Sequence, residues 1–218
     1  MVDIYMDAAT LADIERAGAD PKIAGATTNP SLMKKAGITN YRAFAKQALE
    51  AINGKTISFE VLADDLPTME RQAREIASWG ANVYVKIPVT DTHGRFCRGW
   101  FERLRDLNLN VTAVMCREHL WQLCEVLRGH HIISVFCGRI TDTGAEIPVF
   151  HFDPRRIRKL WASTRDVGSV IRAEKMGFDI ITMTPDLIAK LPLLGKDLGE
   201  YSRETVQQFY RDGQGIEF

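Results

Sequence analysis

One lysine lies in a segment that otherwise contains aromatic, β-branched and proline residues. Lys86 stands in the middle of YVKIPVT, where a lysine is unusual because removing an ammonium group from water is costly. An apolar environment or a second cation favours the neutral amine, which is the form that attacks a carbonyl carbon. The segment therefore indicates an amine nucleophile. The alternative is a lysine at a strand end whose ammonium group reaches solvent.

Two acidic residues, Asp7 and Glu60, can supply the proton transfers that such a nucleophile requires. They stand in the short strand-like runs DIYMD and TISFEV. Proton donors and acceptors are needed when a carbinolamine loses water and when a carbon–carbon bond breaks. In a third run, Asn110 and Thr112 can orient a water molecule or a substrate hydroxyl. Each of these residues can instead be a structural ion-pair or hydrogen-bond partner.

Two arginines, Arg139 in FCGRI and Arg165 in ASTRD, are candidates for binding a phosphate. A guanidinium group matches phosphate oxygens in a bidentate way, and Ser163 lies close by in the same segment as Arg165. A further basic run is expected to be a solvated surface: Arg155, Arg156 and Arg158. The five histidines show no metal-ligand spacing, so neither a metal nor a cofactor is predicted.

Eight short strand-like runs alternate with longer runs of helical periodicity, and these elements must position the candidate residues. The expected strands are 3–7, 24–28, 56–61, 82–89, 110–115, 132–136, 159–163 and 179–183. Segments between them, such as LPTMERQAREIASWG, are apolar at helical spacing. The pattern predicts an α/β fold, a single (β/α)₈ TIM barrel over residues 1–218, with a C-terminal helical extension from about residue 186. An open doubly wound sheet is the alternative, which the lack of G-x-G-x-x-G weakens.

Residue parity predicts which side chains point into the barrel, because side chains alternate between the two faces of a strand. In 82–89, four apolar residues share one face and leave Lys86 on the other: Val83, Val85, Ile87 and Val89. The same alternation directs Asp7, Glu60, Asn110 and Thr112 inward. It also directs Val111, Ala113 and Met115 outward. Active sites of this fold form at the carboxyl ends of the strands.

The stretch between Arg139 and Ser163 fits the alternating pattern poorly. Only 23 residues lie between them, and they include Gly144, Pro148 and Pro154. A parallel crossover needs about a dozen residues or more, so the connection is feasible. Its helix is expected to be short or absent.

The composition argues against several kinds of protein. The 28 basic and 28 acidic residues give a net charge of zero, which argues against a general nucleic-acid binder. No apolar run approaches the roughly 18 residues that would cross a membrane. The N-terminus shows no signal-peptide pattern, and the four cysteines form no C-x-x-C pair. A cytoplasmic location with reduced cysteines is expected.

Five segments in this order resemble the transaldolase family, specifically the short subfamily that includes fructose 6-phosphate aldolase: GATTNPSL, YVKIPVT, NVTAVMC, ISVFCGRI and ASTRD. The resemblance runs from Asp7 to about Leu191. It implies that Lys86 forms a Schiff base with C2 of a ketose phosphate and that Asp7 serves as acid and base in cleaving the C3–C4 bond. It further implies that Glu60, with Thr112 through a water, transfers protons at the imine.

The resemblance also implies which residues bind the substrate. By this resemblance, the phosphate is bound by Arg139, Ser163 and Arg165. The rest of the sugar is bound by Thr28, Asn29, Asn110, Ser134 and Phe136. The implied reaction moves a dihydroxyacetone unit from fructose 6-phosphate or sedoheptulose 7-phosphate, or a similar ketose phosphate, to an aldose phosphate. No cofactor takes part.

Two positions separate the subtypes of this family. Aldolase-type members carry glutamine at the position of Glu60 and tyrosine at that of Phe136, so this sequence resembles the transferases at both. Transfer is favoured over release of free dihydroxyacetone, which remains the alternative. Departures at Val135 and Cys116, and a shortened segment 141–161, leave open another anionic sugar in a specialised pathway. A non-catalytic sugar-phosphate-binding barrel is less favoured, because Lys86, Asp7 and Glu60 are all present.

The C-terminal segment predicts a last helix with an apolar stripe. Ser202 is its expected N-cap, and Val206, Phe209 and Tyr210 lie on one face. The helix can pack on its own barrel or on a neighbouring subunit. The resemblance implies a homo-oligomer, a pentamer or a decamer, in which C-terminal helices are exchanged.

Overall fold

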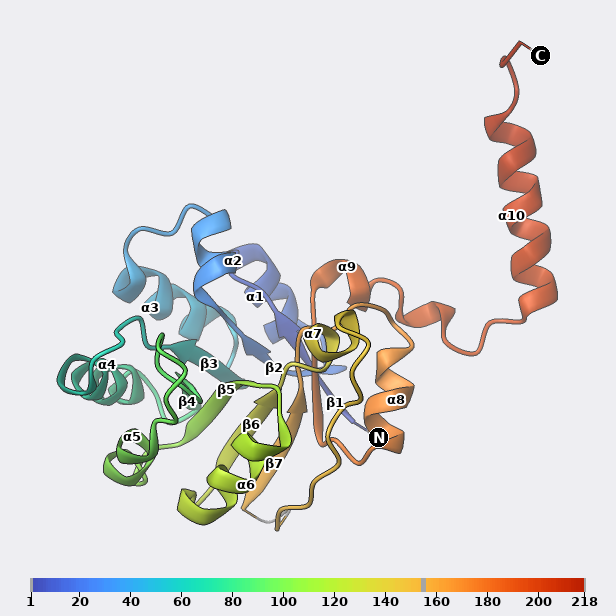
Figure 1. Ribbon diagram of the computed structural model, residues 1–218. Coiled ribbons are helices and arrows are strands. Elements are labelled where there is room, and N and C mark those ends of the chain that lie inside the picture. Colours follow the sequence, from blue (N-terminus) through green and yellow to red (C-terminus); the bar gives the residue numbers. More distant parts are fainter. Residues whose placement is uncertain (1, 154–155, 218) are drawn as a thin grey trace.

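Eight parallel strands close into a barrel in which each strand pairs with the next and β8 pairs with β1 (Figure 1). The computed structural model describes residues 2–153 and 156–217. The strands are β1 (Asp3–Asp7), β2 (Ile23–Thr27), β3 (Thr56–Glu60), β4 (Val83–Pro88), β5 (Leu109–Val114), β6 (His131–Val135), β7 (Ile157–Trp161) and β8 (Ile180–Met183). The barrel confirms the predicted (β/α)₈ fold.

Helices follow the strands, and most of them lie around the outside of the barrel, whereas the last helix does not (Figure 1). They are α1 (Leu11–Ala19), α2 (Pro30–Lys35), α3 (Tyr41–Ala51), α4 (Leu66–Ser78), α5 (Arg98–Arg103), α6 (Arg117–Val126), α7 (Cys137–Asp142), α8 (Ser169–Lys175), α9 (Pro185–Ile188), the 3₁₀ turn η1 (Leu191–Leu193) and α10 (Leu198–Asp212). Several begin at a residue whose side-chain oxygen accepts a first-turn N–H: Thr10, Asn29, Asn40, Asp65 and Asp197.

The core has two layers, which follow from the alternation of side chains along the strands. Outward residues such as Ile57, Phe59, Val85 and Ile87 are fully buried in the layer beneath the helices. A second cluster fills the inside of the barrel: Tyr5, Ile132, Leu160, Ala162 and Ile180, with Tyr84 and Phe136 against it. This inner cluster occupies the lumen, so the site lies above it at the carboxyl ends of the strands.

The alternation fails in β5, where the outward positions predicted for Ala113 and Met115 are wrong. The register with β6 shifts between Val111 and Val114, and Ala113 has a φ of 61°. A residue in the left-handed region turns the chain, so the residues after it point to the opposite faces of the sheet from those that simple alternation predicts. Val114 is therefore buried on the outer side, while Met115 is 37% exposed.

The connection from β6 to β7 has only the six-residue helix α7, as the short segment predicts. In the described part of this connection after α7, 143–153, there is no second helix. Aromatic rings cover the barrel there instead. The Phe150 ring lies 6.1 Å from that of Phe178, which lies 5.3 Å from that of Trp161.

Strand β7 begins two residues earlier than predicted and ends at Trp161, which leaves Ser163 in the loop that follows. Arg158 lies inside this strand, and its Nη2 lies 2.6 Å from Oδ2 of Asp3 at the amino end of the barrel. Arg158 is therefore half-buried and paired with Asp3, rather than fully solvated as predicted. Arg156 is exposed, as predicted, and Arg155 lies outside the described residues.

Helix α10 projects away from the barrel (Figure 1). Its N-cap is Asp197, whose Oδ1 accepts the N–H of Glu200 at 2.8 Å, so the prediction of Ser202 as N-cap is wrong by a turn. The predicted stripe is present and is not covered by the chain's own barrel: Val206, Phe209 and Tyr210 are 62%, 67% and 73% exposed.

Candidate active site

A cavity of about 450 Å³ opens at the carboxyl ends of the strands. Ten of the predicted site residues line it: Asp7, Asn29, Glu60, Lys86, Thr112, Ser134, Phe136, Arg139, Ser163 and Arg165. Thr28 and Asn110 do not line it. The barrel thus brings together residues from seven strands or the segments after them, at the end where this fold assembles active sites.

Lys86 is 6% exposed on β4 and is held by two oxygen atoms. Its Nζ donates to the main-chain oxygen of Thr28 at 2.9 Å and lies 3.1 Å from Oε2 of Glu60. Glu60 and Lys86 are direct neighbours in the register of β3 and β4, so the sheet itself sets this pairing. Glu60 can accept the proton that the ammonium group must lose to become a nucleophile.

Asp7, at the end of β1, receives hydrogen bonds on one carboxylate oxygen. Thr27 Oγ1 donates to Oδ1 at 2.9 Å and Asn29 Nδ2 donates at 3.4 Å. Burial raises the pKa of the Asp7 carboxyl, and it outweighs the nearby charge of Lys86 and these two hydrogen bonds, which lower it. A carboxyl whose pKa is raised can both give and take a proton nearer to neutral pH.

Three residues of the floor form a hydrogen-bonded chain, while a fourth is unpaired. Asn110 Nδ2 donates to Ser58 Oγ at 3.1 Å, and Ser134 Oγ donates to Asn110 Oδ1 at 2.6 Å. Asn110 therefore orients Ser134, which does line the cavity. The buried Oγ1 of Thr112 has no hydrogen-bond partner among the described residues. A buried hydroxyl at a cavity wall is satisfied by water or by a polar ligand.

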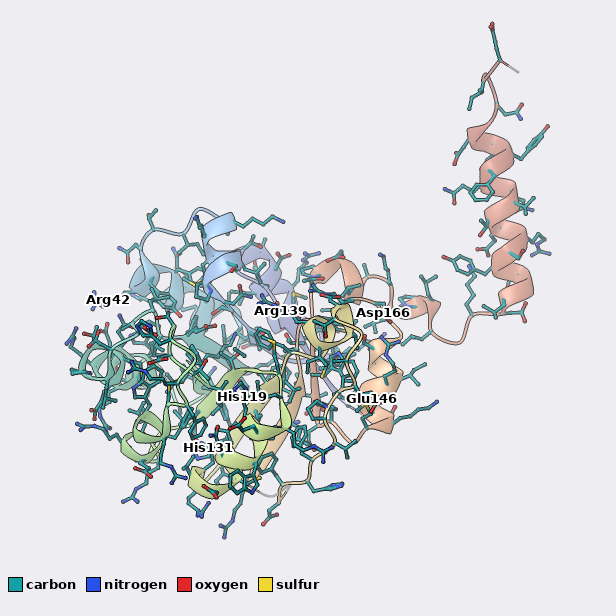
Figure 2. All side chains as sticks on the ribbon, viewed as in Figure 1. Arg42, His119, His131, Arg139, Glu146 and Asp166 are labelled. Atoms are coloured by element: carbon teal, nitrogen blue, oxygen red, sulfur yellow. The ribbon has the colours of Figure 1, made fainter. Side chains whose placement is uncertain are left out.

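The two arginines stand on one side of the cavity, after β6 and β7. Arg139 lies on α7 (Figure 2), and its Cζ is 5.2 Å from the centre of the Phe136 ring. It has no acidic partner in residues 2–153 and 156–217. Arg165 forms an ion pair with Asp142, in which Nη2 lies 2.5 Å from Oδ2. Ser163 has a φ of 59°, in the left-handed region that L-residues rarely adopt, and such residues cluster at active sites.

Tyr41 supports the site from outside the cavity, and the sequence did not reveal it. Its hydroxyl accepts the N–H of Glu60 at 2.8 Å and donates to the carbonyl of Glu60 at 3.0 Å. Burial raises the pKa of the Tyr41 phenol, which keeps the hydroxyl a donor. Both main-chain groups of Glu60 are fixed from the neighbouring helix α3. Thr27 and Thr182 were also missed, although their inward parity in β2 and β8 could have indicated them.

The closed barrel and the lysine-centred cavity at the carboxyl ends of its strands define a (β/α)₈-barrel enzyme. Residues 4–218 match the family model described as Transaldolase/Fructose-6-phosphate aldolase. The chain belongs to this family.

Curated relatives agree with that assignment. A probable transaldolase of Roseiflexus sp. (strain RS-1) is 31% identical over 189 residues, which cover 83% of this chain and 85% of the relative. A probable transaldolase of Rhodospirillum centenum (strain ATCC 51521 / SW) is 29% identical over 224 residues, which cover 97% and 93%.

Solved structures share the fold at low sequence identity. Dihydrodipicolinate synthase from Rhodopseudomonas palustris aligns with a TM-score of 0.51 at 13% identity, covering 84% of this chain and 70% of that one. 2,3-Dimethylmalate lyase aligns with a TM-score of 0.57 at 11% identity, covering 99% and 85%. Separately, within the described ranges no helix has the length and apolar character needed to cross a membrane.

Proposed function

We propose that the chain is a transaldolase-type transferase, which moves a dihydroxyacetone unit from a ketose phosphate to an aldose phosphate through a Schiff base on Lys86. The observation that carries the proposal is the Lys86 amine, which is buried at the cavity wall with Oε2 of Glu60 3.1 Å away. Membership of the family supports it. Fructose 6-phosphate and sedoheptulose 7-phosphate are the proposed donors.

Imine formation uses Lys86, Glu60 and Thr112. The neutral Nζ attacks C2 of the ketose, and the carbinolamine loses water. Glu60 takes the proton that Nζ releases and returns one to the departing hydroxyl, since it is within hydrogen-bond distance of Nζ. The unpaired hydroxyl of Thr112 orients the water in this exchange.

Cleavage of the C3–C4 bond uses Asp7. Its carboxylate accepts the proton of the C4 hydroxyl, the bonding electrons pass into the imine, and an enamine on Lys86 remains as the aldose phosphate leaves. The raised pKa of Asp7 suits it to hold that proton. Addition of the enamine to an acceptor aldehyde, such as erythrose 4-phosphate or glyceraldehyde 3-phosphate, reverses these steps. Hydrolysis of the imine then frees Lys86.

Substrate binding follows from the same geometry. Ser134 and Asn29 line the cavity and bind hydroxyls of the dihydroxyacetone unit. Arg139, Ser163 and Arg165 bind the phosphate on the other side. Thr28 and Asn110 act from beneath the wall, through the carbonyl on Lys86 and the hydrogen bond to Ser134.

Dependence on an acceptor tests transfer directly. With fructose 6-phosphate and erythrose 4-phosphate, we expect a seven-carbon ketose phosphate and glyceraldehyde 3-phosphate. With fructose 6-phosphate alone, we expect little free dihydroxyacetone. Rapid release of dihydroxyacetone without an acceptor would instead assign the chain to the aldolase-type lyases.

Replacing Phe136 by tyrosine is expected to shift the reaction from transfer towards cleavage. Phe136 lines the cavity beside Arg139 and carries no proton donor. A phenol at this position can protonate the enamine, and positioned proton donors change rates by about tenfold or more. The ratio of free dihydroxyacetone to transfer product is the measurement. An unchanged ratio would show that the hydroxyl does not reach the enamine.

We further propose that the chain forms a homo-oligomer, a pentamer or decamer, held together through α10. The exposed stripe Val206, Phe209 and Tyr210 supports this proposal. The helix that carries it projects from the barrel (Figure 1), and a large apolar surface in such a place needs a covering partner.

A cytoplasmic location is proposed as well, since all four cysteines are free, as in a reducing compartment.

Removal of residues 198–218 is expected to convert the oligomer into a smaller species, as measured by light scattering. Phe209→Ser with Tyr210→Ser is the milder companion, since it leaves the helix in place but removes two of the three side chains of the stripe. Both should lower the mass at unchanged circular dichroism of the barrel. A full-length monomer would refute the oligomer, and an unchanged mass in both variants would refute the role of α10.

A further inference from the structure

We infer that Asp142 is a positioning residue, which fixes the guanidinium group of Arg165 so that one edge faces the anion of the substrate. The inference rests on the proposed function, because that proposal assigns a phosphate to Arg165. It adds a residue that does not touch the cavity and that the sequence did not indicate.

The contacts of Arg165 divide its guanidinium group into an occupied edge and an open edge. Nε lies 3.0 Å from Oδ2 and 3.3 Å from Oδ1 of Asp142, and Nη2 lies 2.5 Å from Oδ2. Nη1 has no partner within the described ranges. Arg165 lines the cavity and Asp142 does not. The carboxylate therefore holds the guanidinium group from outside the cavity.

The backbone brings the two residues together. Gly138, in the first turn of α7, lies against the loop after β7: a Cβ on this glycine would be 1.6 Å from the main-chain oxygen of Ser163 and 3.1 Å from Cγ of Arg165. No other residue type fits at such an approach. Asp142 ends the same helix. The short helix thus rests directly on the loop that carries Ser163 and Arg165.

The chemistry of a guanidinium group gives this arrangement a use. Its planar fork can bind a carboxylate along one edge and a phosphate along another. An arginine with several free rotatable bonds loses rotamer freedom when it binds an anion, which reduces affinity. A carboxylate that already holds the Nε edge removes that cost before the substrate arrives.

Stability is a weak explanation for the pair. The side chains of Arg165 and Asp142 are 51% and 50% exposed, and ion pairs this open to solvent contribute little to folding. Arg139 offers the contrast. It has no acidic partner in the described part of the chain and rests on the Phe136 ring. The site therefore combines a free cation with one whose orientation is set.

A neighbouring acid supplies a matched control. Asp166 directly follows Arg165, is also 50% exposed, and pairs with Arg172 rather than with Arg165, at 2.5 Å between Nη2 and Oδ2. Asp166→Ala removes the same charge as Asp142→Ala, but from the loop that carries Arg165 and without removing a partner of Arg165. It reports how much the loss of a negative charge alone strengthens anion binding.

The experiment measures inorganic phosphate binding by calorimetry and the kinetics of fructose 6-phosphate and of unphosphorylated fructose, both with an acceptor aldehyde. Relative to Asp166→Ala, Asp142→Ala should raise the Kd of phosphate and the KM of fructose 6-phosphate roughly three- to tenfold, the cost of ordering one long side chain. The kcat and the KM of fructose should stay within twofold of those of Asp166→Ala. Adding Asp142→Ala to Arg165→Ala should cause no further loss of phosphate affinity.

Three results with the variants would overturn the inference. The first is phosphate binding that is unchanged or tighter in Asp142→Ala than in Asp166→Ala. The second is an equal rise in KM for fructose 6-phosphate and for fructose. The third is additive losses of phosphate affinity from Asp142→Ala and Arg165→Ala. Calorimetry distinguishes failure of this inference from failure of the proposed function. If the wild-type protein binds phosphate but does not turn over fructose 6-phosphate, the proposed reaction fails while the effect of Asp142 on Arg165 is still measured. If it binds no phosphate, the inference fails.

Discussion

Replacing Lys86 by methionine is expected to lower the turnover of fructose 6-phosphate by about 10⁴-fold or more, because the variant has no nucleophile and the covalent route is lost. The barrel should remain folded. The side chain has a similar length, and the Glu60 carboxylate that loses its cation lines an open cavity where water can reach it. Activity in a coupled assay, with circular dichroism as the check of the fold, is the measurement.

Lys86→Arg separates covalent catalysis from electrostatics at the same position. The guanidinium group keeps a positive charge beside Glu60 and the carbonyl of Thr28, but it forms no Schiff base. We expect it to be as inactive as the methionine variant. An arginine variant within about tenfold of the wild type would show that the charge, and not an imine, matters here.

Replacing Asp7 by asparagine is expected to lower kcat by roughly 10²- to 10⁴-fold, the usual contribution of a positioned acid or base. Asparagine keeps an oxygen that can accept from Thr27 and Asn29, so the surrounding hydrogen bonds persist. Trapping of the ketose by Lys86 should survive, because Asp7 acts in bond cleavage. Loss of trapping in this variant would place Asp7 in imine formation instead.

The same substitution is expected to raise the melting temperature at neutral pH. Burial raises the pKa of Asp7 in the folded protein, so folding favours the protonated acid. Its contribution to stability is full below the ordinary pKa of aspartate, about 3.9, and is lost as the pH rises through the folded value. Asparagine avoids that loss. The advantage of the variant should therefore shrink as the pH falls towards about 4.

Asp65→Asn is the control for this pH dependence and should show the opposite sign. Asp65 is the N-cap of α4, and the hydrogen bond from the Thr68 N–H lowers the pKa of its carboxyl. Its stabilising effect is present at neutral pH and is lost as the pH falls. A variant of Asp7 that behaved like this control would refute the raised pKa.

The sequence was sufficient to predict the barrel and much of the site because both depend on local alternation. Lys86 and Glu60 each oppose an apolar face in their strands, and adjacent parallel strands bring such residues side by side in one register. The alternation does not depend on the helices around the barrel. Parity alone therefore placed Lys86, Glu60, Thr112 and Asp7 on one cavity.

Contacts between elements that are far apart in the sequence could not be predicted in this way. Tyr41 reaches the backbone of Glu60 from a helix, and Asp142 reaches Arg165 only because Gly138 lets α7 rest on the next loop. The left-handed backbone of Ala113 changes which residues at the end of β5 point outward, and no glycine in the sequence indicates this conformation. In the last helix, Asp197 and Ser202 are both good N-caps, and composition does not choose between them.

The most direct test of the Schiff base is mass spectrometry of the wild-type protein after treatment with fructose 6-phosphate and borohydride, followed by peptide mapping. Borohydride reduces an imine to a stable amine, so we predict one added sugar fragment per chain on the peptide that contains Lys86, and none in Lys86→Met. The absence of an adduct under conditions of turnover, or an adduct on a different lysine, would contradict the assignment of Lys86 as the nucleophile.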